Sequence, residues 1–193
     1  MTAPAKINYR FYKGSTVKEV LRWESTVKVY KPITGITRSA PVVLTVPNNE
    51  VPVDWRVKVT SVLGMLDINS TETYNRATAV TTNTITINDI NSLNFKDYVS
   101  GGVIEYNKPI DLTNYTASMT IKANVTDIAN IHLATTANGG IIINNTTKTI
   151  VISIPASVTD TFDFVTAYYL LEIIDSTGSV IPFSAGTITL IIG

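Results

Sequence analysis

Apolar and polar residues alternate with a period of two through the second half of the chain. In residues 116–122, Ala117, Met119 and Ile121 share one face, and polar side chains occupy the other. This pattern is typical of a strand with one buried face. The same pattern, or a short apolar run between turn residues, predicts strands at 140–143, 149–154, 168–174, 179–183 and 187–192, with one helical turn at 155–160.

The first half of the chain also predicts β-structure, at less regular spacing. Strands are expected at 9–12, 17–24, 41–46, 55–62 and 84–87. In the run that begins at Trp55, Val57 and Val59 lie on the face that Trp55 occupies. We expect Trp23 and Trp55 to fill two separate β cores.

Composition supports this reading and excludes several classes of protein. Of the 193 residues, 29 Thr, 24 Ile and 20 Val give 73 β-branched side chains, which lose rotamer freedom in helices and favour strands. A helical bundle, a coiled coil and a Rossmann-type enzyme are therefore not expected. Fifteen basic and fifteen acidic residues balance, and no basic cluster indicates a nucleic-acid partner.

Targeting and redox signals are also missing from the sequence. No cysteine is present, so we expect neither a disulfide framework nor a thiolate metal site. The first ten residues lack the apolar core of a signal peptide. The uncharged tail 176–193 contains glycine and proline and alternates in polarity, which predicts a pair of strands rather than a membrane span.

One segment of the second half matches a known pattern. Residues 109–122 read Pro-Ile-Asp-Leu-Thr-Asn-Tyr-Thr-Ala-Ser-Met-Thr-Ile-Lys. The segment resembles the P-x-D-L-T-G-Y-T-A-x-M-x-I-R strand of immunoglobulin-like domains in tailed-phage baseplate and tail proteins, of the type at the N-terminus of the baseplate upper protein. Asn114 replaces the usual Gly, and Lys122 replaces the usual Arg. The resemblance continues through 138–144, 148–154, 169–175 and 186–190.

The same family normally opens with two strands that lead directly into this segment. Residues 9–16 and 20–24 look like that opening, yet residues 31–104 separate them from the rest. The separating stretch resembles the first catalytic cysteine half-domain of ubiquitin-activating enzymes, without a cysteine for thioester chemistry. The expected fold is therefore all-β: a discontinuous antiparallel immunoglobulin-like β-sandwich (5–30 plus 105–193) with an inserted small β-barrel-like module (31–104).

Candidate catalytic residues are few. His132 is the only histidine, and without a second histidine or a cysteine we expect it at a surface or strand edge rather than in a metal site. Glycan hydrolysis needs two carboxyl groups in a cleft, and the candidate pairs are Asp160 with Asp163 and Glu50 with Asp54. All four lie in predicted loops, where solvated acids are common. We expect no catalytic residue, no metal and no cofactor.

Aromatic side chains are the candidates for an interaction site. Tyr168, Tyr169 and Phe162 could contact a partner or stack on a sugar ring. Because successive strand residues point to opposite faces, at most one of the two tyrosines is buried in a simple strand.

The resemblance implies a non-enzymatic virion protein of a tailed phage, located in the tail, collar or baseplate and made in the host cytoplasm. Its expected partners are copies of itself in a cyclic homo-oligomer and other tail or neck proteins. The 45% apolar content suits a chain that buries surface in an assembly. Two alternatives remain open: a receptor- or glycan-binding module of the same particle, and a hydrolase acting on capsule or cell wall.

Overall fold

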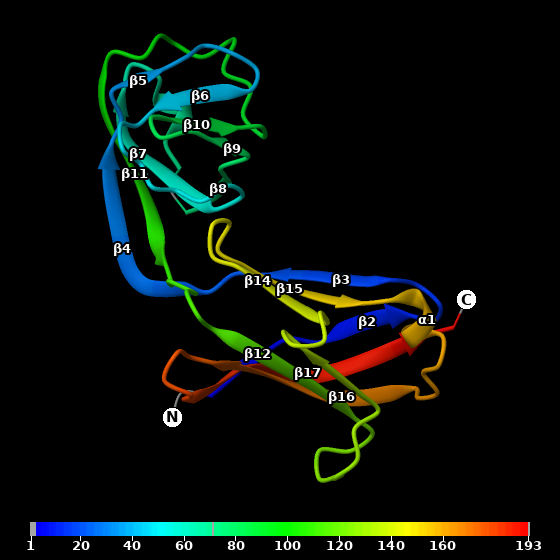
Figure 1. Cartoon of the computed structure of the whole chain (residues 1–193). Coiled ribbons are helices and arrows are strands. Elements are labelled where there is room, and N and C mark those ends of the chain that lie inside the picture. The colour runs from blue at the N-terminus through cyan, green and yellow to red at the C-terminus, as the bar shows by residue number, and fades with distance from the viewer. Residues whose placement is uncertain (1–2, 71, 193) are drawn as a thin grey trace. The chain divides into compact units, whose positions relative to one another are not determined.

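A computed structural model describes residues 3–70 and 72–192, and Figure 1 shows its strands. The chain forms two compact units. Unit 1 comprises the described residues of Met1–Arg22 and Asp111–Gly193, and unit 2 is Trp23–Ile110. Almost all regular structure is β, as the alternating pattern predicts.

The boundaries between the units differ from the sequence-based ones. Strands β4 (Glu24–Pro32) and β11 (Ser100–Pro109) pair with each other in antiparallel register over most of their length. Both therefore belong to unit 2, and the expected limits at 31 and 104 cut through them. Where the chain enters and leaves unit 2, the Ile110 amide donates to the Trp23 carbonyl at 3.1 Å.

Unit 1 is a β-sandwich with a six-stranded and a three-stranded sheet. The larger sheet has the order β1-β17-β16-β12-β13, with β2 also paired to β17, and the smaller has the order β14-β15-β3. Its elements are β1 (Ala5–Lys6), β2 (Tyr9–Tyr12), β3 (Val17–Leu21), β12 (Thr116–Lys122), β13 (His132–Thr135), β14 (Ile141–Asn144), β15 (Thr149–Ile154), the single turn α1 (Ala156–Thr159), β16 (Thr166–Ile174) and β17 (Val180–Ile191).

Alternation explains which side chains form the core of unit 1. Ala117, Met119 and Ile121 of β12 are buried, as are Leu171 and Ile173 of β16. The turn before β12 has the geometry that its sequence requires, because Asn114 adopts a φ of 61°. Asparagine tolerates this left-handed conformation better than most residues. Asn114 therefore fits the turn, although the pattern that residues 109–122 resemble has glycine at this position.

The C-terminal tail forms one strand rather than the expected pair. Strand β17 pairs with β16 on both sides of Gly186, with a register shift near Leu171. Its other edge receives β1 and then β2, both in parallel orientation. A Cβ built on Gly186 would overlap the carbonyl oxygen of Ile7, which lies between β1 and β2. The glycine thus permits a close backbone approach instead of ending the strand.

Unit 2 contains two four-stranded sheets, with the orders β5-β6-β10-β9 and β4-β11-β7-β8. Its remaining elements are β5 (Gly35–Ile36), β6 (Val42–Thr45), β7 (Arg56–Leu63), the 3-10 turn η1 (Leu66–Ile68), β8 (Asn75–Arg76), β9 (Ala79–Val80) and β10 (Thr84–Ile87). The expectation of a barrel-like module is wrong in this respect: no barrel closes among the described strands, because the two ladders do not join.

The two tryptophans have different environments. Trp55 is fully buried in the core of unit 2, and its indole Nε1–H donates to the Asn107 carbonyl at 2.8 Å. Trp23 is only partly buried, so the expectation that it fills a second core is wrong. Over residues 3–70 and 72–192, no helix is long and apolar enough to cross a membrane.

Candidate binding site

The outer face of the large sheet of unit 1 carries two rows of neighbouring side chains. Strand pairing places Thr120, Leu170 and Ala185 side by side across β12, β16 and β17. Lys6 of β1 is the next residue in this row, opposite Ala185. The row exists because each residue alternates with a core residue of its own strand.

The second row lies one pleat further along the same strands. Lys122 of β12 is opposite Tyr168 of β16, which is opposite Thr187 of β17. The Thr187 amide donates to the side-chain oxygen of Asn8 at 3.1 Å, so Asn8 is fixed at the end of this row. Tyr168 therefore lies between a lysine and two polar side chains.

These two rows form the floor of a hollow of about 610 Å³, which we call the outer-face hollow. Pro4 before β1 and Val125 in the loop after β12 also line it. Its volume lies within the range of small-molecule sites, which are mostly apolar with a few polar groups. Figure 1 shows the strands β12, β16 and β17 that carry its floor.

The charges in the outer-face hollow have one sign. Lys6 and Lys122 line it, and no acidic residue does so among the described residues. The Lys122 ammonium donates to the backbone oxygen of Asp127 at 2.8 Å. The Asp127 carboxylate instead accepts hydrogen bonds from Asn124 in its own loop. Neither lysine charge is therefore paired with a carboxylate that lines the site.

The structure separates the three aromatic candidates. Tyr168 is 39% exposed in the outer-face hollow, whereas Tyr169, which also borders the hollow, is 4% exposed, and Phe162 is 2% exposed. The Tyr169 hydroxyl donates to the Ile7 carbonyl at 2.9 Å, and its ring lies 5.1 Å from that of Tyr9. Burial raises the pKa of Tyr169. Tyr169 and Phe162 thus stabilise the core and offer little ring surface to a partner.

His132 lies at the rim of the same core. Its ring centroid is 6.0 Å from that of Phe162, and burial lowers its pKa. Within the part of the chain that the structure describes, no three His, Cys, Asp or Glu side chains come close enough to hold a metal ion. Packing against Phe162 therefore explains the position of the imidazole ring.

Neither candidate carboxylate pair lines the outer-face hollow. Glu50 binds Lys31 at 2.9 Å, and this contact lowers the pKa of Glu50. A general acid needs the opposite shift. Asp160 and Asp163 are both exposed at the end of α1.

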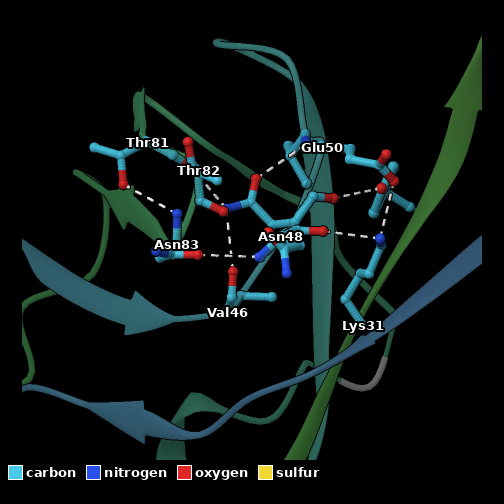
Figure 2. A network of polar contacts seen from close by, with 10 residues as sticks. Lys31, Val46, Asn48, Glu50, Thr81, Thr82 and Asn83 are labelled. Atoms are coloured by element: carbon cyan, nitrogen blue, oxygen red, sulfur yellow. Dashed lines mark hydrogen bonds and ion pairs between the residues drawn. The ribbon is translucent and has the colours of Figure 1, made fainter.

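Figure 2 shows a network of polar contacts beside Glu50 that the sequence did not predict. The Asn49 amide group donates to the carbonyl oxygens of Val46, Thr81 and Thr82 at 2.8–3.2 Å. Its side-chain oxygen accepts the amide of Val51 at 3.0 Å. Asn49 thus ties two loops of unit 2 together and has a structural role.

A second exposed feature lies at one end of unit 2. Leu63, Leu66 and Val99 are 56%, 59% and 71% exposed. The Val99 amide donates to the Leu63 carbonyl at 3.0 Å. The Leu66 amide donates to the carbonyl of Gly64, which follows Leu63 in the chain. We call these three residues the apolar end. It lies at the start of β11, whose other terminus, Pro109, leads out of the unit.

The sequence indicated only part of the outer-face hollow. The sequence indicates Tyr168 as an aromatic candidate together with Tyr169 and Phe162, and it does not indicate Lys6, Lys122 or Thr187. Lys122 could have been found by pairing 116–122 with 168–174. Lys6 could not, because its position depends on the parallel pairing of β1 with β17.

No known family model matches the chain, and no curated protein matches it either. The functional interpretation therefore depends on the geometry above and on the local resemblance of residues 109–122.

Proposed function

We propose that the chain is a non-enzymatic structural component of a tailed-phage virion, in its tail, collar or baseplate. The resemblance of residues 109–122 to a strand of baseplate and tail domains motivates the phage assignment. The apolar end of unit 2 is the observation that supports assembly. Three large apolar side chains that are exposed on segments joined by backbone hydrogen bonds favour burial against another chain.

A cyclic homo-oligomer is the proposed form of this assembly, because in a closed ring every subunit has its contact surface covered by a neighbour. Light scattering after size-exclusion chromatography should find a defined oligomer for the whole chain. Leu66→Asp should shift it to the monomer, because a carboxylate would be buried in the contact. Val27→Asp is the matched control, since Val27 is 58% exposed in the same unit but outside the apolar end. A wild-type monomer, or equal effects of both variants, would contradict the contact.

Location in a particle is tested independently of oligomerisation. Quantitative peptide mass spectrometry of purified virus particles from the source should find the chain at a fixed copy number. Absence from intact particles would overturn the virion assignment.

A receptor- or glycan-binding module of the same particle is the second candidate function. The outer-face hollow favours it, because an exposed tyrosine ring lies on an apolar floor between polar side chains. The hydrolase alternative has no comparable support, since neither candidate carboxylate pair lines the outer-face hollow and Lys31 lowers the pKa of Glu50, whereas a general acid needs a raised pKa.

A further inference from the structure

We infer that the outer-face hollow binds an anionic saccharide, whose carboxylate or phosphate groups contact Lys6 and Lys122 while one sugar ring packs on Tyr168. This inference specifies the ligand class of the second candidate function and rests on it.

The two lysines lie on opposite sides of Tyr168. Lys6 belongs to β1 and Lys122 to β12, and these strands are three positions apart in the sheet. Three strand spacings of about 4.8 Å separate them by roughly 14 Å. A ligand with charged groups at two points along its length can therefore contact both lysines.

Charge complementarity excludes a cationic ligand. The charged side chains that line the hollow are Lys6 and Lys122. The acid nearest along β16 on the same face is Glu172, two residues beyond Leu170, and it is outside the lining. Ammonium groups without a carboxylate partner in the site favour an anion.

The floor favours a sugar over a flat apolar ligand. The Tyr168 ring and the Leu170 side chain supply apolar surface, which the C–H face of a sugar ring can cover. Thr120, Thr187 and Asn8 supply hydroxyl and amide groups at the margins of that surface. Sugar hydroxyl groups need such donors and acceptors when they lose water.

The backbone disfavours an acidic peptide. An extended peptide gains affinity by pairing with a free strand edge. Strands β12, β16 and β17 are each paired on both sides, so their backbone groups already bond within the sheet. The strand edge that borders the hollow belongs to β1, which is two residues long and therefore too short to hold an extended peptide. Recognition on the floor uses side chains, as it does for a saccharide.

The first experiment uses the whole chain and an array of neutral, carboxylated and phosphorylated oligosaccharides. The expected result is binding to acidic members, weakened at high salt because exposed charges are screened. Titration of trigalacturonic acid against its methyl ester, and of a mannose 6-phosphate disaccharide against mannobiose, then separates carboxylate from phosphate recognition.

The array also distinguishes the inference of an acidic ligand from the glycan-binding role on which it rests. Equal binding of neutral and acidic members overturns the charge inference and keeps the glycan-binding role. Failure to bind any saccharide overturns both.

Matched variants test the site itself. Lys6→Gln should weaken binding of the best acidic saccharide about tenfold, because a hydrogen bond to a charged group is lost. Lys18→Gln, on the exposed side of β3 in the other sheet, should leave it unchanged. Equal effects of the two variants would show attraction to overall charge and overturn the site.

Tyr168→Ala should weaken the same titration about tenfold. Tyr12→Ala is its control, since Tyr12 is 58% exposed in the same unit and does not line the hollow. Retained affinity in Tyr168→Ala would overturn the stacking contact. Unchanged thermal unfolding shows that each variant has folded.

Discussion

The two units of this chain reach a β fold by different means. Unit 1 is specified mainly by alternation, since its strands bury every second residue along β12 and β16. Buried polar side chains that hold loop backbone occur in both units, since the Thr159 hydroxyl of unit 1 donates to the Ser15 carbonyl at 2.7 Å. Unit 2 adds a buried amide side chain that makes four such bonds. Asn49 is 1% exposed, and Ser92 is fully buried with bonds to backbone groups of Thr37 and Ser39.

The turns show the same difference. Residues other than glycine with positive φ lie mostly in one stretch of unit 2: Asn48, Glu50, Asp54 and Ser61, against Asn114 and Lys148 in unit 1. Such conformations are unfavourable unless the surroundings impose them. Unit 2 thus holds more of its backbone in unfavourable conformations than unit 1 does, and the side-chain bonds of Asn49 fix the loop in which Asn48 and Glu50 lie.

The largest expected effect tests this difference directly. Asn49→Leu removes four side-chain hydrogen bonds and takes this partner from the buried Val46 carbonyl and Val51 amide, so we expect unit 2 to lose about 3 kcal/mol or more of unfolding free energy. Both tryptophans lie in unit 2, so urea denaturation followed by tryptophan fluorescence reports on this unit. Asn88→Leu, at an exposed position, should have almost no effect. A loss below about 1 kcal/mol would mean that the network is dispensable.

The next largest effect concerns unit 1. Gly186→Ala places a methyl group against the Ile7 carbonyl and should cost about 2 kcal/mol, because backbone must shift. Gly178→Ala, at a φ of 87° with open space around it, should cost about 1 kcal/mol through backbone strain alone. Amide hydrogen exchange in β16 and β17 measures the loss of stability in both variants. If Gly178→Ala proved the more costly, the close approach of β1 to β17 would not be required.

A smaller loss of stability is expected when one buried tyrosine hydroxyl group is removed from each unit. The Tyr106 hydroxyl donates to the Asn49 carbonyl at 2.7 Å, and the Tyr169 hydroxyl donates to the Ile7 carbonyl at 2.9 Å. Tyr106→Phe and Tyr169→Phe should each cost about 1 kcal/mol. Only Tyr106→Phe should shift the tryptophan-detected transition. A shift of that transition by both variants would show that the units unfold together.

The smallest expected effect is the dependence on pH. The Lys28 contact lowers the pKa of Glu105 in unit 2, and bonds from Thr113 and Asn145 lower that of Asp111 in unit 1. A carboxyl group with a lowered folded-state pKa stabilises the fold above its unfolded pKa, near 4.5 for Glu and 3.8 for Asp. That stability is lost as the pH falls through the folded-state pKa.

Glu105→Gln and Asp111→Asn test this dependence one unit at a time. Each variant should unfold at a slightly lower temperature than the wild type at about pH 6, and the difference should vanish in acid. Calorimetric unfolding across this range measures it. A difference that persists below the folded-state pKa would assign the effect to packing rather than to charge.

The sequence by itself determined the β class and the faces of most long strands. The 116–122 run, for example, buries Ala117, Met119 and Ile121 as its alternation predicts. It also placed Tyr168 and Tyr169 on opposite faces. These features follow from local geometry, because the side-chain period of a strand is a property of the chain itself.

Tertiary structure decided which strands become neighbours. The pairing of β4 with β11 set the boundary of unit 2, and the parallel pairing of β1 with β17 brought Lys6 to the outer-face hollow. Asn49 gained its role only when the loops around Val46 and Thr81 met. Each of these contacts joins residues far apart in sequence, and its free energy depends on the register and packing of the partner strand, which no local pattern encodes.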